Sequence, residues 1–287
     1  MKKQLLIPAF LMAASLSANA AGIHTGLLNY WALDGDGDDS ASDFAEGNST
    51  VEDNLTAGGT AGAVTILSTG GLFGGAADFE RQTGNDGRLA ASDSVDVDFG
   101  GESISVSLWA QFEDDDSGNW QSLLAKGEGS NYRISTNRRT SADNANAAFG
   151  AGDLDSGVNI QDDMLWHHIV VAATTGSPVQ IYVDGALANT GGNSNIVEAG
   201  NNFSGELWIG NNSGASAGNP PMPSPVRMWD GLIDDVAQWD RELTASEIST
   251  IYNEGLAGNS LGAITIPEPS SITLALIAGL GLLRRRR

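Results

Sequence analysis

The chain has 287 residues, of which 37 are glycine and none is cysteine. It carries 36 acidic and 14 basic residues, so its formal net charge is −22 at pH 7. The missing cysteines exclude disulfides and thiolate chemistry, and the negative charge argues against nucleic acid as a partner, because phosphates would be repelled. The acidity is compatible with divalent cations, a basic partner or solubility, and by itself it selects none of these.

The first twenty residues have the order of a signal peptide. Lys2 and Lys3 form a basic start, residues 5–16 are apolar, and Ala18-Asn19-Ala20 supplies the small residues that a signal peptidase requires. We therefore expect residues 1–20 to be removed by cleavage after Ala20, and the rest of the chain to be exported.

Short strands separated by polar turns are the dominant pattern from residue 22 to residue 255. Ile104, Val106 and Leu108 alternate with serines, which predicts a strand with one buried face. Residues 166–174 are largely apolar on both faces, as in a strand buried between two layers. Further strands are expected at 179–183, 206–210 and 232–239, with a tight turn at Asp184-Gly185.

One helix is predicted near the end of this region. Thr244 and Glu247 have the spacing of a capping box, in which each side chain satisfies a backbone donor at the helix start. One apolar side follows, and Gly255 is the expected end of the helix. Residues 256–266 then have the composition of a linker.

The last 21 residues contain three ordered features: Pro267-Glu268-Pro269, an apolar run over residues 272–283, and the basic residues Arg284, Arg285, Arg286 and Arg287. Twelve apolar residues make about 18 Å of helix at ~1.5 Å per residue, whereas a bilayer core of ~30 Å needs nearer 20 residues. The arginines would hold the end on the cytoplasmic side. The segment therefore predicts a transient membrane contact followed by cleavage, rather than a permanent anchor.

Six segments in order resemble the laminin-G-like domain of the concanavalin A-like superfamily: residues 28–34, 71–79, 104–109, 166–170, 181–185 and 231–248. The resemblance implies an all-β fold over residues 22–255, in which two antiparallel sheets form a jelly-roll sandwich with one short C-terminal helix. The segment 267–287 resembles the PEP-CTERM sorting signal. That resemblance implies processing by an exosortase and secretion to the surface or matrix of a Gram-negative bacterium.

The residues give little support to catalysis. A glucanase of this superfamily would carry Glu-x-Asp-x-x-Glu on one strand, so that two carboxylates flank the scissile bond, and no such strand is present. The acidic run 113–116 is contiguous and is expected to form a solvated loop. His167 and His168 coincide with a structural strand of the family. We therefore predict a non-catalytic protein, with a divergent polysaccharide hydrolase as an alternative.

A calcium site is the more concrete chemical prediction. The loop that starts at Asp34 has aspartates at alternate positions, and calcium prefers such oxygen ligands. The family resemblance implies a structural calcium between the first strand and the closing Ile-Asp strand. It assigns Asp34 and Asp234 as ligands, with Asp36 as a third. The alternative is a flexible acidic turn, with Asp234 capping a strand.

For ligand recognition, Trp120 and Trp229 lie in loop-like sequence beside Asn119 and Asp230. An aromatic face next to hydrogen-bonding groups suits a pyranose ring, although exposed aromatic residues also make protein contacts. The leading hypothesis is thus a non-catalytic surface or matrix protein that binds glycan or another matrix component. The alternative is a structural protein that adheres without a specific sugar ligand.

Overall fold

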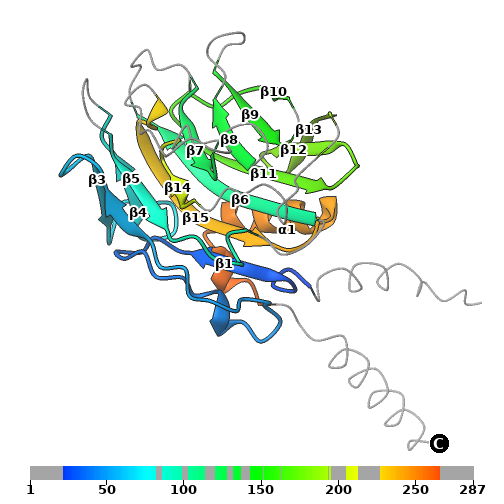
Figure 1. Cartoon of the computed structure of the whole chain (residues 1–287), viewed down its shortest axis with the longest axis horizontal. Helices are drawn as coiled ribbons and strands as arrows, with labels where there is room; N and C mark the ends of the chain where they lie inside the picture. The colour runs from blue at the N-terminus through cyan, green and yellow to red at the C-terminus, as the bar shows by residue number, and fades with distance from the viewer. Residues whose placement is uncertain are drawn as a thin grey trace, which may run out of the picture. The chain divides into compact units, whose positions relative to one another are not determined.

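The computed structural model describes residues 22–81, 86–98, 103–113, 120–127, 132–136, 143–150, 152–161, 163–192, 194, 205–212 and 227–265. Within them the chain forms two antiparallel sheets that pack face to face (Figure 1). The predicted fold class, a two-sheet sandwich with one C-terminal helix, is confirmed.

The first sheet has eight strands in its described part. Its order is β13 (Ala186–Gly191), β12 (Val179–Val183), β11 (Trp166–Thr174), β6 (Ser103–Phe112), β15 (Gly231–Trp239), β4 (Ala76–Phe79) and β3 (Val64–Leu67), and β1 (Leu27–Trp31) also pairs with β15. The N-terminal strand thus lies against the last strand of the domain, as the antiparallel pairing of Trp31 with Val236 shows.

The second sheet has seven strands in its described part. Its order is β10 (Leu154–Asn159), β9 (Asn144–Phe149), β8 (Tyr132–Thr136), β7 (Ser122–Ala125), β14 (Leu207–Ile209), β5 (Arg88–Ala91) and β2 (Thr56–Gly58). Strands β7, β8 and β9 follow one another in the sequence as well as in the sheet, whereas β14 enters between β7 and β5 from far along the chain. In Figure 1, β8, β9 and β10 of this sheet are drawn above β6 and β15 of the first sheet.

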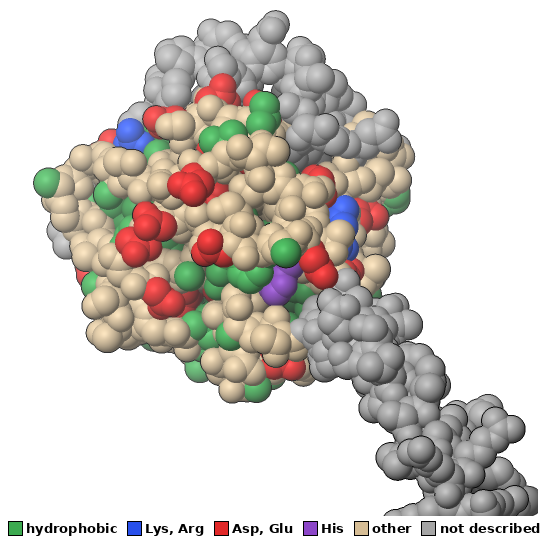
Figure 2. Space-filling model, turned by 90° about the horizontal axis from the view of Figure 1, so that it is seen from below, with side chains coloured by type: hydrophobic (Ala, Val, Ile, Leu, Met, Phe, Trp, Pro, Cys, Tyr) green, Lys and Arg blue, Asp and Glu red, His purple; other side chains and the backbone are tan. Residues whose placement is uncertain are grey.

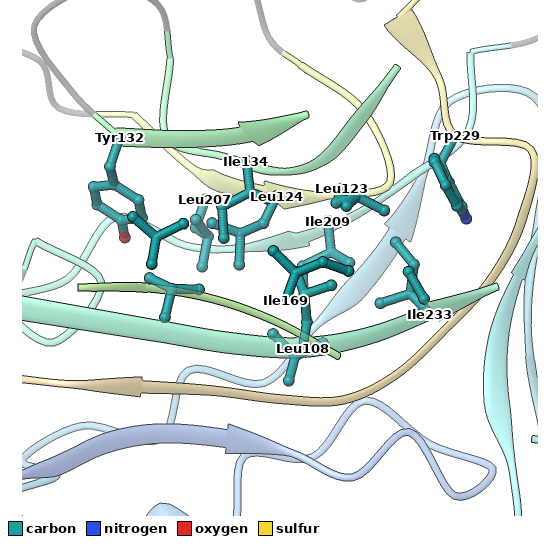
Figure 3. Close-up of a cluster of buried hydrophobic side chains, with 14 of the residues drawn as sticks. Leu108, Leu123, Leu124, Tyr132, Ile134, Ile169, Leu207, Ile209, Trp229 and Ile233 are labelled. Atoms are coloured by element: carbon teal, nitrogen blue, oxygen red, sulfur yellow. The ribbon is translucent and has the colours of Figure 1, made fainter. Parts of the chain in front are cut away.

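The core lies between the sheets. It is built from the apolar residues that alternate with polar ones along the strands. Leu108, Ile169 and Ile233 of the first sheet point toward Ile134 and Ile209 of the second (Figure 3), and all five side chains are buried. Burying a side chain of this size stabilises the fold by about 1.5–3 kcal/mol. Inward positions are therefore fixed by packing, and the residues between them must face outward.

The predicted turn at Asp184-Gly185 is confirmed. Both residues have positive φ, +51° and +74°, as a two-residue hairpin between β12 and β13 requires. Asp184 also accepts a hydrogen bond from the backbone N–H of His168, so the turn is tied to the neighbouring strand β11.

Helix α1 (Ala245–Leu256) begins with the predicted capping box, in which Thr244 and Glu247 exchange hydrogen bonds. It covers the outward face of the first sheet, where the Tyr252 ring stacks on Trp109 with centroids 5.7 Å apart. The expectation that Gly255 ends the helix is wrong, because the helix continues to Leu256. Glycine is required at 255 because a Cβ there would lie 2.3 Å from Cζ2 of Trp109.

The expectation of a linker over residues 256–266 is corrected for its described part. Leu261 and Ile264 are buried, and the short helix η4 (Leu261–Ala263) packs against the domain. The backbone N–H of Leu261 donates to Asp235 at 2.9 Å, and its carbonyl lies 3.1 Å from Nε2 of His24. The compact unit therefore runs from His24 to Ile264.

The predicted signal peptide, residues 1–20, and the predicted sorting segment, residues 267–287, lie outside the described residues. No helix in the described ranges combines the length and hydropathy needed to cross a bilayer.

Candidate functional site

The outward face of the second sheet carries a row of uncharged polar side chains. On β8, Tyr132 and Ile134 enter the core, so Ser135 points outward. Ser135 lies directly opposite Ser122 of β7 on one side and Asn146 of β9 on the other. We call Ser122, Ser135 and Asn146 the polar row.

Two members of the polar row lack internal partners. Oγ of Ser135 and both Nδ2 and Oδ1 of Asn146 are buried and form no hydrogen bond with the residues that the structure describes. Ser122 differs, because its Oγ lies 3.5 Å from the carbonyl oxygen of Ile134, which accepts its hydrogen bond. A buried polar atom without a partner costs about 1–3 kcal/mol, so native structures usually supply water, an ion or a ligand at such positions.

Trp120 lies beside this face and is only partly buried. Its backbone has φ +59°, in the left-handed region that costs a non-glycine residue of order 1–3 kcal/mol. The next residue is firmly held: the Gln121 side chain accepts from Gln161 at 2.7 Å, and its carbonyl accepts from Thr136 N–H at 2.8 Å. The strained residue therefore directly precedes a residue that is held by its side chain and by its backbone.

The indole of Trp120 meets the sheet at Arg133. Cζ of Arg133 lies 5.6 Å from the centre of the ring, a cation–π distance. Arg133 faces outward two residues before Ser135, and its guanidinium is ion-paired with Asp153. Trp120, Arg133 and the polar row thus share one side of the second sheet. Sequence reasoning missed Arg133, Ser135 and Asn146, although the alternation of Tyr-Arg-Ile-Ser and Asn-Ala-Asn-Ala marks them as outward positions.

The second predicted aromatic contact, Trp229, does not join this face. Its side chain is fully buried between the sheets (Figure 3), packs edge-on against Phe112 with centroids 5.6 Å apart, and donates from Nε1 to the carbonyl of Leu232. The expectation that Trp229 offers a ring to a ligand is therefore wrong. Asp230 is also buried, where Oδ1 accepts from the backbone N–H of Arg81 at 3.0 Å. Asn119 lies outside the described residues.

Two of the three predicted calcium ligands meet at one turn. Oδ2 of Asp234 accepts from the backbone N–H groups of Leu72 and Phe73, and Oδ1 of Asp34 accepts from that of Gly75 at 2.6 Å. Oδ1 of Asp234 is buried and has no hydrogen-bond partner in the described part of the chain. Burial, reinforced by the charges of Asp235 and Asp34, raises the pKa of the Asp234 carboxyl to about 7. This pair of carboxylates would suit a hard cation.

Asp36 is placed differently. It is exposed, and its Oδ1 accepts only from the nearby backbone N–H of Asp38 at 3.3 Å. Within the described ranges, no three His, Cys, Asp or Glu side chains are grouped so that they could hold a metal ion. Acidic side chains are instead dispersed over the face seen in Figure 2. Calcium binding stays a prediction, which rests on Asp34 and Asp234.

The two histidines of β11 have structural partners. His167 lies between Asp184 (Nδ1–Oδ2 2.9 Å) and Asp163 (Nε2–Oδ1 3.1 Å). His168 is fully buried, lies 2.8 Å from Oγ of Ser107, and stacks on Trp109. Burial lowers the pKa of His168 to about 3, so this imidazole is neutral at ordinary pH. Because His168 and Ser107 are both buried, the geometry does not support nucleophilic catalysis there.

Comparisons with known proteins agree with the two-sheet sandwich described above. A family model described as the concanavalin A-like lectin/glucanases superfamily matches residues 83–249. No curated protein sequence matches this chain. Among solved structures, domain 4 of AbnA, a GH43 extracellular arabinanase from Geobacillus stearothermophilus in complex with arabinotriose, is similar with a TM-score of 0.52 and 18% identity. That match covers 78% of this chain and 97% of the other.

Two further similar structures are longer proteins. The binding domain of Paraclostridial Mosquitocidal Protein 1 has a TM-score of 0.56 and 13% identity, over 81% of this chain and 53% of its own. A chain of botulinum neurotoxin type C, whose cell entry depends on interaction with two ganglioside molecules, has a TM-score of 0.51 and 14% identity, over 82% and 52%. This chain thus spans about half the length of these two. At such identities the likeness establishes the fold alone.

Proposed function

This chain belongs to the concanavalin A-like lectin/glucanases superfamily. From that premise we propose that it is a non-catalytic extracellular module, which binds glycan through the outward face of its second sheet. The observation that carries the proposal is Trp120, a partly exposed ring held by strained backbone above Arg133 and beside the polar row. An apolar ring face bordered by hydrogen-bonding groups matches a pyranose, which has an apolar face and a polar rim.

The similar structures support this proposal at the level of the fold. Domain 4 of the arabinanase was solved with arabinotriose, and the neurotoxin type C depends on gangliosides for cell entry. Both cases connect proteins of this fold with carbohydrate. The buried His168–Ser107 pair and the absence of a paired-carboxylate strand motif in the sequence favour binding over hydrolysis.

The test is retention on immobilised or gel-embedded polysaccharides, measured with calcium present. Trp120→Ala should weaken retention about tenfold or more, which corresponds to ~1.4 kcal/mol of binding free energy. Trp166→Ala is the matched control, because Trp166 is also partly exposed but lies on the outward face of the first sheet. A blank panel with the unmodified protein, or equal losses in both variants, would remove the proposal.

Self-association without sugar binding would instead favour the adhesive alternative, provided that Trp120→Ala leaves it unchanged. Release of reducing ends from a soluble β-glucan panel, lost on changing one acidic residue, would favour the hydrolase.

We also propose that residues 1–20 direct export and that residues 267–287 are processed by an exosortase-type enzyme. The order of Pro-Glu-Pro, twelve apolar residues and four arginines supports this. Mass spectrometry of the mature protein from a host with and without an exosortase is the test. An intact C-terminus in both hosts would contradict the proposal.

A further inference from the structure

We propose that the side chains of Lys126 and Asp98 join in an intramolecular amide bond, an isopeptide cross-link, with Asp93 as the proton carrier. The reaction needs no external ligand, because the amine and the carboxyl already touch in the folded chain. It would give a covalent cross-link to an exported chain that has no cysteine and therefore no disulfide. This proposal does not depend on whether the chain binds glycan.

Lys126 is the only lysine beyond residue 3, and arginine supplies every other permanent positive charge there. The ion pairs Arg133–Asp153 and Arg241–Glu247, for example, use arginine. Only 4% of the Lys126 side chain is exposed, although lysine is seldom buried. A lysine amine can lose its proton and act as a nucleophile, whereas a guanidinium stays protonated. The chain thus keeps its one amine where chemistry, rather than surface charge, distinguishes lysine from arginine.

Two unequal carboxyl groups meet this amine. Nζ of Lys126 contacts Oδ1 of Asp98 and lies 2.9 Å from Oδ1 of Asp93. The Asp98 side chain is 27% exposed and that of Asp93 is 38% exposed. Burial raises the pKa of Asp98 and outweighs the opposite effect of the Lys126 charge. A raised pKa favours the neutral acid, which is the form that an amine attacks, so Asp98 is the acyl donor.

The backbone at both reacting residues is held by Tyr132, whose ring enters the core (Figure 3). Its carbonyl accepts from the N–H of Lys126 at 2.9 Å, and its hydroxyl donates to the carbonyl of Val97 at 2.5 Å. Asp98 follows Val97, and its own N–H donates to the Ser94 carbonyl at 3.0 Å. Well-oriented groups in one molecule can reach effective concentrations of ~10⁵–10⁸ M. A condensation that is slow between free amines and acids can therefore proceed here unaided.

The condensation balances without an oxidant or a second reactant. A proton first passes from the ammonium of Lys126 to the carboxylate of Asp98, which leaves a neutral amine and a neutral acid. Nζ then bonds to Cγ of Asp98, and a second proton passes from Nζ to Asp93. Asp93 returns that proton to the oxygen whose bond to Cγ breaks, and one water molecule leaves. The ion pair becomes a neutral amide, and Asp93 ends as the carboxylate that it was at the start.

The cross-link encloses part of both sheets. The chain between residues 98 and 126 includes β6 of the first sheet and β7 of the second. A covalent ring of this kind restricts the unfolded chain, as a disulfide does, and so favours the folded state.

Peptide mass spectrometry of the natively purified, full-length protein tests the bond. Trypsin cleaves after Lys126 only if its amine is free. An unlinked chain gives residues 89–126 and 127–133 as separate peptides, whereas a linked chain gives one peptide, residues 89–133. We expect this single peptide, lighter than its sequence mass by one water molecule. Its fragment ions should place the bond between Asp98 and Lys126.

Matched variants assign each role. Lys126→Arg keeps the charge but has no amine to acylate, so it should restore the sequence mass and lower the melting temperature. Asp98→Ala should also restore the sequence mass. Asp93→Asn keeps both reacting groups and removes the proton carrier, so the lighter peptide should accumulate ~10²-fold more slowly or less. Asp36→Ala, at an exposed carboxylate elsewhere, should leave the lighter peptide unchanged.

The unmodified protein decides first, so no variant has to fold for the proposal to fail. Cleavage after Lys126 at the full sequence mass overturns it. A loss of water that persists in Asp98→Ala overturns the assignment of Asp98, and an unchanged rate in Asp93→Asn overturns the role of Asp93.

Discussion

The two outward faces of this sandwich arise from the same alternation of residues but are completed in different ways. On the first sheet, Trp109 and His168 are covered by helix α1, and Gly255 allows the helix to approach. On the second sheet, Ser135 and Asn146 lack internal partners, and Trp120 remains partly exposed in a strained conformation. These residues are buried on both faces, but among the described residues the second face keeps polar groups that form no hydrogen bond. Stability should therefore depend on the first face and binding on the second.

The largest expected effect tests the covered face. Trp109→Ala should destabilise the protein by about 3–5 kcal/mol, because it removes a large buried ring from beneath α1 and leaves a cavity. Chemical denaturation followed by tryptophan fluorescence and circular dichroism measures the loss. Trp120→Ala is the counterpart on the other face and should cost less than ~1 kcal/mol. Equal losses for the two variants would show that the faces do not differ as described.

The second effect concerns calcium at the turn that Asp34 and Asp234 hold. Saturating calcium, at about 100 times its Kd, should stabilise the fold by ~2.7 kcal/mol through mass action. Asp234→Ala should abolish the rise in melting temperature, whereas Asp36→Asn should keep it, because Asp36 is exposed and bonds only within its own loop. An unchanged melting temperature after addition of a chelator would argue against the metal.

A third effect separates strain from binding at Trp120. Glycine tolerates φ +59° without the steric cost paid by tryptophan. Trp120→Gly should therefore keep or raise stability, by up to ~1 kcal/mol, while it abolishes polysaccharide retention. Scanning calorimetry and retention assays on the same preparation measure both properties. A clear loss of stability would mean that the ring, rather than a ligand, accounts for the strained backbone.

The smallest effect is a pH dependence on β11. Burial lowers the pKa of His167, but the carboxylates of Asp184 and Asp163 outweigh it, so the pKa is raised above 6.5. The contribution of His167 to stability is then present in full below about pH 6.5 and is lost as pH rises through its folded-state pKa. Such partly exposed pairs contribute ~0.2–1 kcal/mol. The raised pKa of Asp234, about 7, lowers stability with rising pH in both proteins, so the difference between them is the measure. Denaturation midpoints between pH 5 and 9 should decline more steeply in the wild type than in His167→Gln.

Sequence reasoning succeeded where the determining interactions are local. The alternation around Ile104–Leu108 predicted strand β6, and the spacing of Thr244 and Glu247 predicted the start of α1. Both features depend on residues within a few positions of one another. Gly255 was assigned the wrong role because its contact, Trp109, is more than a hundred residues away.

The candidate site was predictable only in part, for the same reason. Trp120 and Trp229 both lie in loop-like sequence, yet Trp229 enters the core because its segment leads directly into the central strand β15. The sequence around Asn146 and Ser135 does not show that these residues are neighbours, because the register of β8 and β9 sets them opposite each other. Leu261 shows no periodic pattern, and its burial depends on docking near Asp235 and His24.

The contact between His24 and Leu261 has a consequence for how the domain can be cut and rejoined. The Asp235 carboxylate accepts from the hydroxyl of Tyr30 at 2.6 Å and from the backbone N–H of Leu261 at 2.9 Å, so it ties both ends of the unit to β15. A recombinant boundary placed at residue 255 would leave that carboxylate without one partner. Because the ends are adjacent, a short peptide could join them, and a circular permutant opened at the Thr175–Gly176 turn would keep every strand intact.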